Sequence, residues 1–443
     1  MSTAGLSRGL VLGLALLGVG PAMGLEVAKA PEEGVAPESS VRFDWGFEVK
    51  THFRSSEEAM AGTPFPHGDG PPIVLRTVDP GETFEVSTVS LLGDAHWGDR
   101  LRGHLKIDLI DLYERNPTST DREVDVDEAW LRWGRGITPG ELPEGRGWYL
   151  KVGKFGHFER QNDRQLESYG LSSTTFNRFE DLGVEAGFDL HRNVYLKASL
   201  TQGNPIFFRD PNALAGDTGA TLLDPENARL EGGLGLIYDS EVEDVGQGDH
   251  LEVGAGLGFR VGDAAGQRSL DLLVWAYQRD LAESVDLEGA ELRGDLALLG
   301  EIAGGQSLPI RGDEKREWGL NVWYYDGPLA FFGQFVDQDL AGLPRLAYEA
   351  ELSWSFELPL RWSAAEQQLF SFVTPVVRYS KLQVDFEHPA VTPLPSRAWD
   401  WRKLDVGLRL HILEQVDLTA EYAFNHGYLT DVNELLLTLR WRR

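Results

Sequence analysis

The fold is decided by the stretch VRFDWGFEVK, residues 41–50. Its odd positions hold Val, Phe, Trp, Phe and Val, whereas its even positions hold charged residues or Gly. Successive side chains of a β-strand point to opposite faces of a sheet. This period of two therefore predicts a strand with one apolar and one polar face.

The same alternation recurs along the rest of the chain. Its clearest copies are residues 101–109, 148–153, 182–190, 194–201, 251–261, 346–358, 405–412 and 434–441. With weaker candidates included there are roughly 17 strands, many near the ten residues that a tilted strand needs to cross a bilayer. Bacterial barrels have even strand numbers, so we expect an all-β fold, a transmembrane antiparallel β-barrel of 16 strands, with 18 as the alternative.

The connections between these strands differ in length. Short turns are expected at 189–193, 326–328 and 412–415, and long polar loops at 54–82, 156–180, 202–227, 280–315 and 383–400. Short periplasmic turns and long extracellular loops are typical of outer-membrane barrels. The soluble alternatives are a β-sandwich and a β-propeller, but no repeat of blade length is present and the aromatic residues are spread evenly along the chain.

The composition excludes several classes of function. The chain has 443 residues, no Cys, 41 Lys and Arg, and 70 Asp and Glu, which gives a formal charge of −29. Without Cys there are no disulfides, Cys-ligated zinc sites, iron–sulfur clusters or thiol catalysis. A strongly acidic chain repels the phosphate backbone, so we expect no nucleic-acid partner.

The N-terminus predicts export. Residues 1–24 contain Arg8, an apolar run at 10–20 and small residues before position 25, as in a cleaved signal peptide. The run is too short to cross a bilayer as a helix. We expect residues 25–40, rich in Pro, Glu and Ala, to be a flexible segment, and residues 41–443 to form the barrel.

Short motifs carry a resemblance to a known family. Residues 152–155 read VGKF at the end of a predicted strand, and residues 178–184 read RFEDLGV at the start of the next. Residues 126–131 (VDEAWL) and 377–382 (VRYSKL) agree with this pattern in order. The chain thus resembles the phosphate-selective porin O/P family of outer-membrane barrels.

The resemblance implies a 16-stranded porin in the outer membrane of a Gram-negative bacterium, commonly a homotrimer, with inward Arg and Lys that favour anions such as phosphate. The partners would be outer-membrane lipid, lipopolysaccharide and small solutes or ions. Two features depart from the family. The charge of −29 is unusual for a protein that attracts phosphate, and the chain ends in Trp441-Arg442-Arg443 instead of an aromatic residue.

The polar face of the strands would line the lumen. Acidic residues of the same parity are about as numerous as basic ones, and a wall of mixed sign gives weak overall selectivity. The expected pore-lining residues are Arg42, Lys50, Arg102, Lys106, Asp108, Lys151, Lys197, Arg229, Arg260, Arg378 and Arg409.

The loop at 156–177 is the candidate constriction. If it folds inward, its charges would narrow the pore and select ions by attraction and by the cost of removing their hydration. The alternative is a loop that points outward into solvent. The residues expected at the constriction are Glu159, Arg160, Asp163, Arg164 and Glu167, followed by Arg178.

Catalysis is not expected. The ten His are scattered singly, and the chain contains neither a G-x-S-x-G nor an H-E-x-x-H motif. We therefore predict no catalytic residues, no metal and no cofactor. The sequence indicates a porin for passive diffusion of small hydrophilic solutes or ions. Anion preference rests on the resemblance, because the acidic composition favours weak selectivity or cations. The alternative is a plugged barrel that acts as a surface scaffold or hydrolase.

Overall fold

The computed structural model describes most of the chain from Val41 onward. The described residues are 41–443 except 58, 67–71, 79–80, 99, 111–123, 144, 162–163, 177–179, 204–250, 264–267, 281–313, 341, 361, 365–366, 386–399 and 428–430. The predicted signal peptide at 1–24 and the flexible segment at 25–40 lie outside the described residues.

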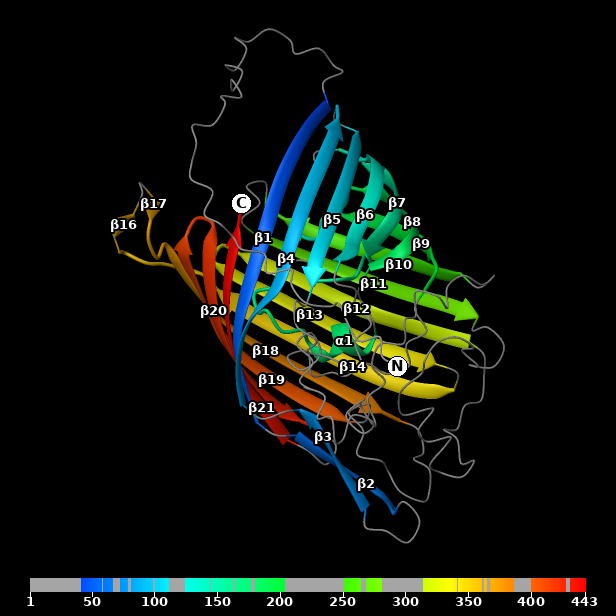
Figure 1. Ribbon diagram of the computed structural model, residues 1–443. Helices are drawn as coiled ribbons and strands as arrows, with labels where there is room; N and C mark the ends of the chain where they lie inside the picture. The colour runs from blue at the N-terminus through cyan, green and yellow to red at the C-terminus, as the bar shows by residue number, and fades with distance from the viewer. Residues whose placement is uncertain are drawn as a thin grey trace, which may run out of the picture. The chain divides into compact units, whose positions relative to one another are not determined.

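Sixteen long strands form one closed antiparallel barrel (Figure 1). The barrel closes because β1 pairs with both β4 and β21. The predicted fold and the strand number of 16 are confirmed. The strands are β1 (Val41–Ser56), β4 (Gly81–Trp97), β5 (Leu101–Ile110), β6 (Val124–Gly134), β7 (Trp148–Gly156), β8 (Glu180–His191), β9 (Val194–Thr201), β10 (Glu252–Gly262), β11 (Arg268–Asp280), β12 (Glu314–Asp326), β13 (Leu329–Leu340), β14 (Leu343–Trp354), β18 (Phe372–Val384), β19 (Trp401–Leu413), β20 (Val416–His426) and β21 (Asp431–Arg442).

Side chains of each strand alternate between the outside and the inside of the barrel. In β10, Val253 and Leu257 point outward and are 57% and 52% exposed, whereas Glu252, the first residue of the strand, is fully buried on the inner side. An apolar outer surface of this extent is unfavourable in water and favourable in hydrocarbon. Among the described residues, no helix has the length and hydropathy to cross a bilayer.

Short strands extend the connections. β2 (Ala59–Pro66) and β3 (Pro72–Val78) form a hairpin between β1 and β4, where the sequence predicted a loop. β15 (Phe356–Glu357) continues β14 along β18, and β16 (Ser363–Ala364) pairs with β17 (Gln367–Gln368). Tight turns at 192–193, 327–328 and 414–415 agree with the predicted ones.

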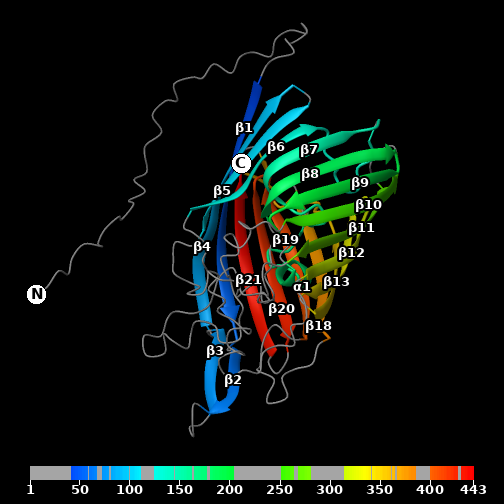
Figure 2. The same ribbon diagram turned by 90° about the vertical axis from the view of Figure 1, so that its right-hand side faces the viewer.

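One short helix lies inside the barrel. α1 (Leu171–Thr175) follows the long connection after β7 and contacts β13, β14, β18 and β19. Figures 1 and 2 show it within the ring of strands from two directions. The connection between β7 and β8 therefore passes through the lumen, and the candidate site is built around it.

Candidate functional site

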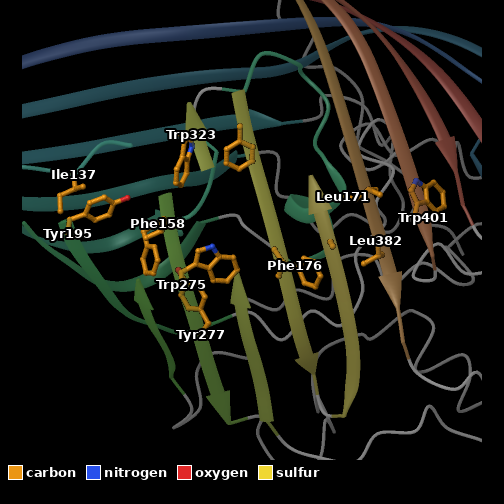
Figure 3. Close-up of a cluster of buried hydrophobic side chains, with 14 of the residues drawn as sticks. Ile137, Phe158, Leu171, Phe176, Tyr195, Trp275, Tyr277, Trp323, Leu382 and Trp401 are labelled. Carbon is orange, nitrogen blue, oxygen red and sulfur yellow. The ribbon is translucent and has the colours of Figure 1, made fainter. Parts of the chain in front are cut away.

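The chain turns into the lumen directly after β7. Phe158 stacks on Tyr277 of β11, with ring centroids 5.4 Å apart. Figure 3 shows Phe158 beside Trp275 and Tyr277 in the cluster of buried side chains on the inner wall. Because Phe158 is only 6% exposed, burial of its apolar ring holds the start of the segment against this wall. We call residues Gly156–Phe176 the inward segment.

Glu159 attaches the inward segment to β11 and β12. Its buried carboxylate accepts a hydrogen bond from the Tyr277 hydroxyl at 2.6 Å. Its main-chain carbonyl accepts a hydrogen bond from the Asn321 side-chain amide at 2.5 Å. Bonds to a carboxylate are stronger than neutral ones, so this contact fixes the segment to strands that are not neighbours of β7.

Ser168 attaches the middle of the inward segment to β18 and β20. Its hydroxyl donates to Glu421, which also accepts the main-chain N–H of Glu167 at 3.1 Å and of Ser168 at 3.3 Å. Arg378 donates to the carbonyl of Ser168 at 2.9 Å and to its hydroxyl at 2.6 Å. Two buried charges of opposite sign thus hold one residue, which gives the segment a defined position.

The approach of α1 to the wall requires a glycine. A Cβ at Gly170 would lie 1.8 Å from the Glu349 carboxylate, so a larger residue here would force the two apart. The next residue, Leu171, is fully buried, and its N–H donates to the Ser380 hydroxyl at 3.3 Å. In Figure 3 Leu171 lies beside Leu382 of β18. The end of the inward segment is therefore as firmly packed as its start.

Glu167 carries its charge over the whole physiological pH range. It pairs with Lys50 and Arg440, each at 3.3 Å. Burial alone would raise the pKa of Glu167, but Lys50 and Arg440 lower it from its ordinary 4.5 to about 2. The stabilisation that these ion pairs give is fully present above pH 4.5 and is lost only as the pH falls toward 2.

His157 responds to pH in the opposite sense. Its ring lies 3.6 Å from a carboxylate oxygen of Asp181 and 3.7 Å from one of Glu159. Burial alone would lower the pKa of His157, but these carboxylates outweigh it and raise the pKa above its ordinary 6.5. The protonated ring therefore stabilises the contacts of His157 with Asp181 and Glu159 below pH 6.5. That contribution to stability is lost as the pH rises through the raised pKa.

A second segment enters the lumen from the opposite end of β7. The turn between β6 and β7, residues 135–147, folds over the inner face of the barrel. The Gly140 N–H donates to Asp271 of β11 at 3.0 Å, and the Tyr195 hydroxyl donates to the same carboxylate at 2.7 Å. Gly140 has a φ of +79°, a conformation that favours glycine, and a Cβ there would meet Tyr325 at 2.8 Å.

A cavity of about 650 Å³ lies between this turn and the inward segment. The turn contributes residues 136–139 to its lining, and the inward segment contributes His157, Phe158, Arg160 and Gln161. The wall between them belongs mainly to β5–β9, and Lys50 of β1 and Arg440 of β21 also line the cavity. Its lining contains eight Lys or Arg (Lys50, Arg102, Arg132, Lys151, Arg160, Arg164, Lys197 and Arg440) and three Glu (Glu128, Glu167 and Glu185), an excess of five positive charges.

Arg160 and Arg164 of the inward segment both line the cavity and both have partners. Arg160 forms an ion pair with Glu180. The Arg164 guanidinium donates to the Leu166 carbonyl at 2.9 Å and lies 3.7 Å from the centre of the Tyr169 ring. Of the other residues expected at a constriction, Glu159 and Glu167 lie in the inward segment as described above, whereas Asp163 and Arg178 lie outside the described residues.

The residues expected along the pore wall are spread over most of the barrel. Those on the inner face of their strands are Lys50, Arg102, Lys106, Asp108, Lys151, Lys197, Arg260, Arg378 and Arg409. Only four of them, Lys50, Arg102, Lys151 and Lys197, line the described cavity. Arg42 lies near the exposed start of β1, where it pairs with Asp44 at 3.0 Å and is 71% exposed. Arg229 lies outside the described residues.

One group of carboxylates resembles a metal site in spacing. Ligand atoms of Asp127, Glu128 and Glu180 lie within 4.8 Å of one another. Each already has a donor, because Asp127 binds Lys106 at 2.6 Å, Glu128 accepts from Trp130 at 2.9 Å and Glu180 pairs with Arg160. Two of the three carboxylates thus have ion pairs within the protein, and the third accepts a hydrogen bond.

Sequence reasoning missed Arg132 and the turn at 135–147. The signal for Arg132 is a change of parity in β6, whose outward apolar residues move from Val124 and Val126 to Leu131 and Trp133. A register shift between Lys106 and Ile107 of the paired strand β5 lies at the same level and turns Arg132 inward. The turn has no comparable signal.

Comparisons with known proteins agree with the fold. No protein-family model matches the chain, and no curated protein matches it. Among similar solved structures, the outer membrane channel DcaP of Acinetobacter baumannii is 12% identical, with 91% of this chain and 97% of that chain covered and a TM-score of 0.50. OprB of Pseudomonas putida at high pH is 10% identical, with 91% and 94% covered and a TM-score of 0.51. The chain therefore has the barrel fold of an outer-membrane channel.

Proposed function

We propose that this protein is an outer-membrane porin through which small hydrophilic solutes or ions diffuse passively, with a preference for anions. The observation that carries the proposal is the positively charged cavity inside a closed barrel with an apolar exterior. Ion selectivity depends on the field at the narrow part of a pore, not on the charge of the whole chain. A basic cavity is therefore compatible with a formal charge of −29.

The inward segment is the proposed constriction. Its attachment to β11, β12, β18 and β20 places it across the lumen, and its residues Arg160 and Arg164 line the basic cavity. A 16-stranded barrel is wide enough for an aqueous channel, so an internal segment is needed to make the pore selective. Positive charge at such a narrowing attracts anions and repels cations.

The proposal also includes export of the chain and its assembly in the outer membrane. Residues 1–24 would direct export and be removed, and the barrel would insert into the outer membrane of a Gram-negative bacterium. The exposed apolar exterior supports contact with lipid. Assembly as a homotrimer is proposed from the resemblance to the porin O/P family.

The first test is ion conduction by the purified mature protein in planar lipid bilayers. We expect discrete conductance steps in KCl and, in a KCl gradient, a reversal potential whose sign corresponds to chloride permeability above that of potassium. The excess of positive charge in the cavity is the reason. Pure protein that inserts without conductance steps would contradict the channel, and a potassium-selective reversal potential would contradict the anion preference.

The loop arginines provide a second test. Arg160→Ala and Arg164→Ala should each shift the reversal potential toward cation selectivity. The change in permeability ratio should be modest, about twofold, because partners already neutralise or bind both guanidinium groups. Arg268→Ala is the control, since Arg268 is 71% exposed and pairs with Asp326 away from the cavity. Reversal potentials that stay unchanged in both loop variants would exclude these side chains from the conducting path.

A further inference from the structure

Two basic residues of the cavity have no anionic partner among the described residues. Lys197 of β9 is 7% exposed and lines the cavity, with aromatic rings as its neighbours: its Nζ lies 5.8 Å from the centre of the Phe158 ring and 5.9 Å from that of Tyr195. The Nε of Arg132 in β6 is buried without a hydrogen-bond partner, and the guanidinium lies 5.8 Å from the Trp130 ring. Every other basic residue of the lining has an ion pair or a carbonyl partner in the described part of the chain.

The strand register places like charges opposite one another on this wall. Arg102 of β5 lies opposite Arg132, and Arg132 lies opposite Lys151 of β7. Like charges at directly opposed positions destabilise a sheet. One carboxylate follows in the row, Glu185 of β8, which pairs with Lys151 at 3.1 Å. Arg102 pairs with Asp94 at 2.7 Å, so Arg132 is the one cation of the row without an ion pair among the described residues, and an anion in the cavity would complete it.

The two unpaired charges lie on either side of the Lys151–Glu185 ion pair. Arg132 and Lys197 are on strands three apart, which separates their strands by about 14 Å at about 4.8 Å per step. Their long side chains reach into the same cavity. A single inorganic anion would contact one of these two charges. A longer molecule with an anionic group at each end would contact both.

We propose that this cavity binds an organic dianion, with one anionic group on Arg132 and the other on Lys197. The cavity volume of about 650 Å³ lies within the range of about 300–1,000 Å³ found for sites of small organic molecules. Trp130, Ile137 and Tyr149 give it apolar surface for the body of such a molecule. The site deepens the proposed porin function and rests on it, because the ligand would be a permeating solute.

The floor of the site is the turn at 135–147. A Cβ at Gly136 would lie 2.4 Å from the Arg132 guanidinium, so the turn is in direct contact with one of the two binding groups. The inward segment bounds the opposite side through Phe158 and Arg160. A solute in the cavity would therefore lie between the turn and the inward segment, where a specific binding site can retain it.

Succinate is a suitable probe in planar bilayers formed with the mature protein. We expect succinate to reduce the KCl current with saturation and acetate to require an about tenfold higher concentration, because acetate engages one charge only. Arg132→Gln and Lys197→Met should each weaken the succinate effect about tenfold, the loss expected for one charged hydrogen bond. Arg316→Gln, at a position outside the cavity that is 66% exposed, and Lys381→Met on β18 are the matched controls and should leave it unchanged.

Calorimetric titration of succinate into detergent-solubilised protein separates this proposal from the porin function. The unaltered protein could fail to conduct and still bind succinate, with an affinity that both cavity variants lower. In that case the channel proposal fails and the binding site stands. Equal effects of succinate and acetate, or full succinate binding in both cavity variants, would overturn the dianion site. Inhibition of the KCl current by inorganic phosphate at an about tenfold lower concentration than succinate would also overturn the dianion site. Heat-dependent gel migration verifies that each variant forms the barrel.

Discussion

Replacing Arg378 with Met is expected to increase the single-channel conductance about twofold or more, because a 16-stranded barrel without an inward segment is a wide aqueous channel. Arg378 is fully buried and donates to Ser168 of the inward segment and, at 2.8 Å, to Asp405 of β19. Its removal leaves Glu351 and Glu421 without this buried cation and leaves Asp405 with Lys403 as its remaining one. Loss of one partner from a buried ion pair costs about 3–5 kcal/mol. We expect the inward segment to leave the wall, which is the cheapest way to admit water to these carboxylates.

A second variant tests the same release without removing a charge. Gly170→Val should push α1 away from Glu349, because a Cβ at this position meets its carboxylate. Lys381→Met on the outer side of β18 is the control and should conduct like the unaltered protein. If Gly170→Val and Arg378→Met both form heat-modifiable barrels with unchanged conductance, the inward segment does not limit the current.

The fold was predictable because lipid imposes a simple rule on the sequence. Each strand must present apolar side chains to hydrocarbon at every second position, and residues 251–261 follow this rule without interruption. The rule fails where the backbone is irregular. In β6 the bulge opposite Lys106 reverses the parity, and Arg132 was missed for that reason. The hairpin of β2 and β3 was expected as loop because residues 59–78 contain Gly and Pro at positions that weaken the alternation.

The site was predictable only in part. The sequence indicated that the loop after β7 carries charges suited to a constriction. A loop inside the lumen and a loop in solvent can have the same charged composition, so the sequence does not distinguish them. Its position depends on distant partners such as Tyr277, Arg378 and Glu421. The sequence also gives no sign of which charges are neutralised. Arg160 and Lys197 are both inward cations, but Arg160 is paired with Glu180 and Lys197 is without an anionic partner in the described residues.

A positive charge on the outer face tests the assignment of that face to lipid. Leu257 is 52% exposed near the middle of β10, so Leu257→Arg would place a guanidinium in the bilayer interior. We expect a loss of about 2–4 kcal/mol in the free energy of unfolding, measured by equilibrium urea titration in lipid vesicles. Val261→Arg is the matched control, because Val261 is on the same face one residue before the strand end, where the cost should fall to about 0–1 kcal/mol. The difference between the two sites measures depth in the membrane, since both substitutions add the same group to the same strand. If Leu257→Arg costs no more than Val261→Arg, the apolar face of β10 is not surrounded by hydrocarbon, and a channel across the membrane has no physical basis.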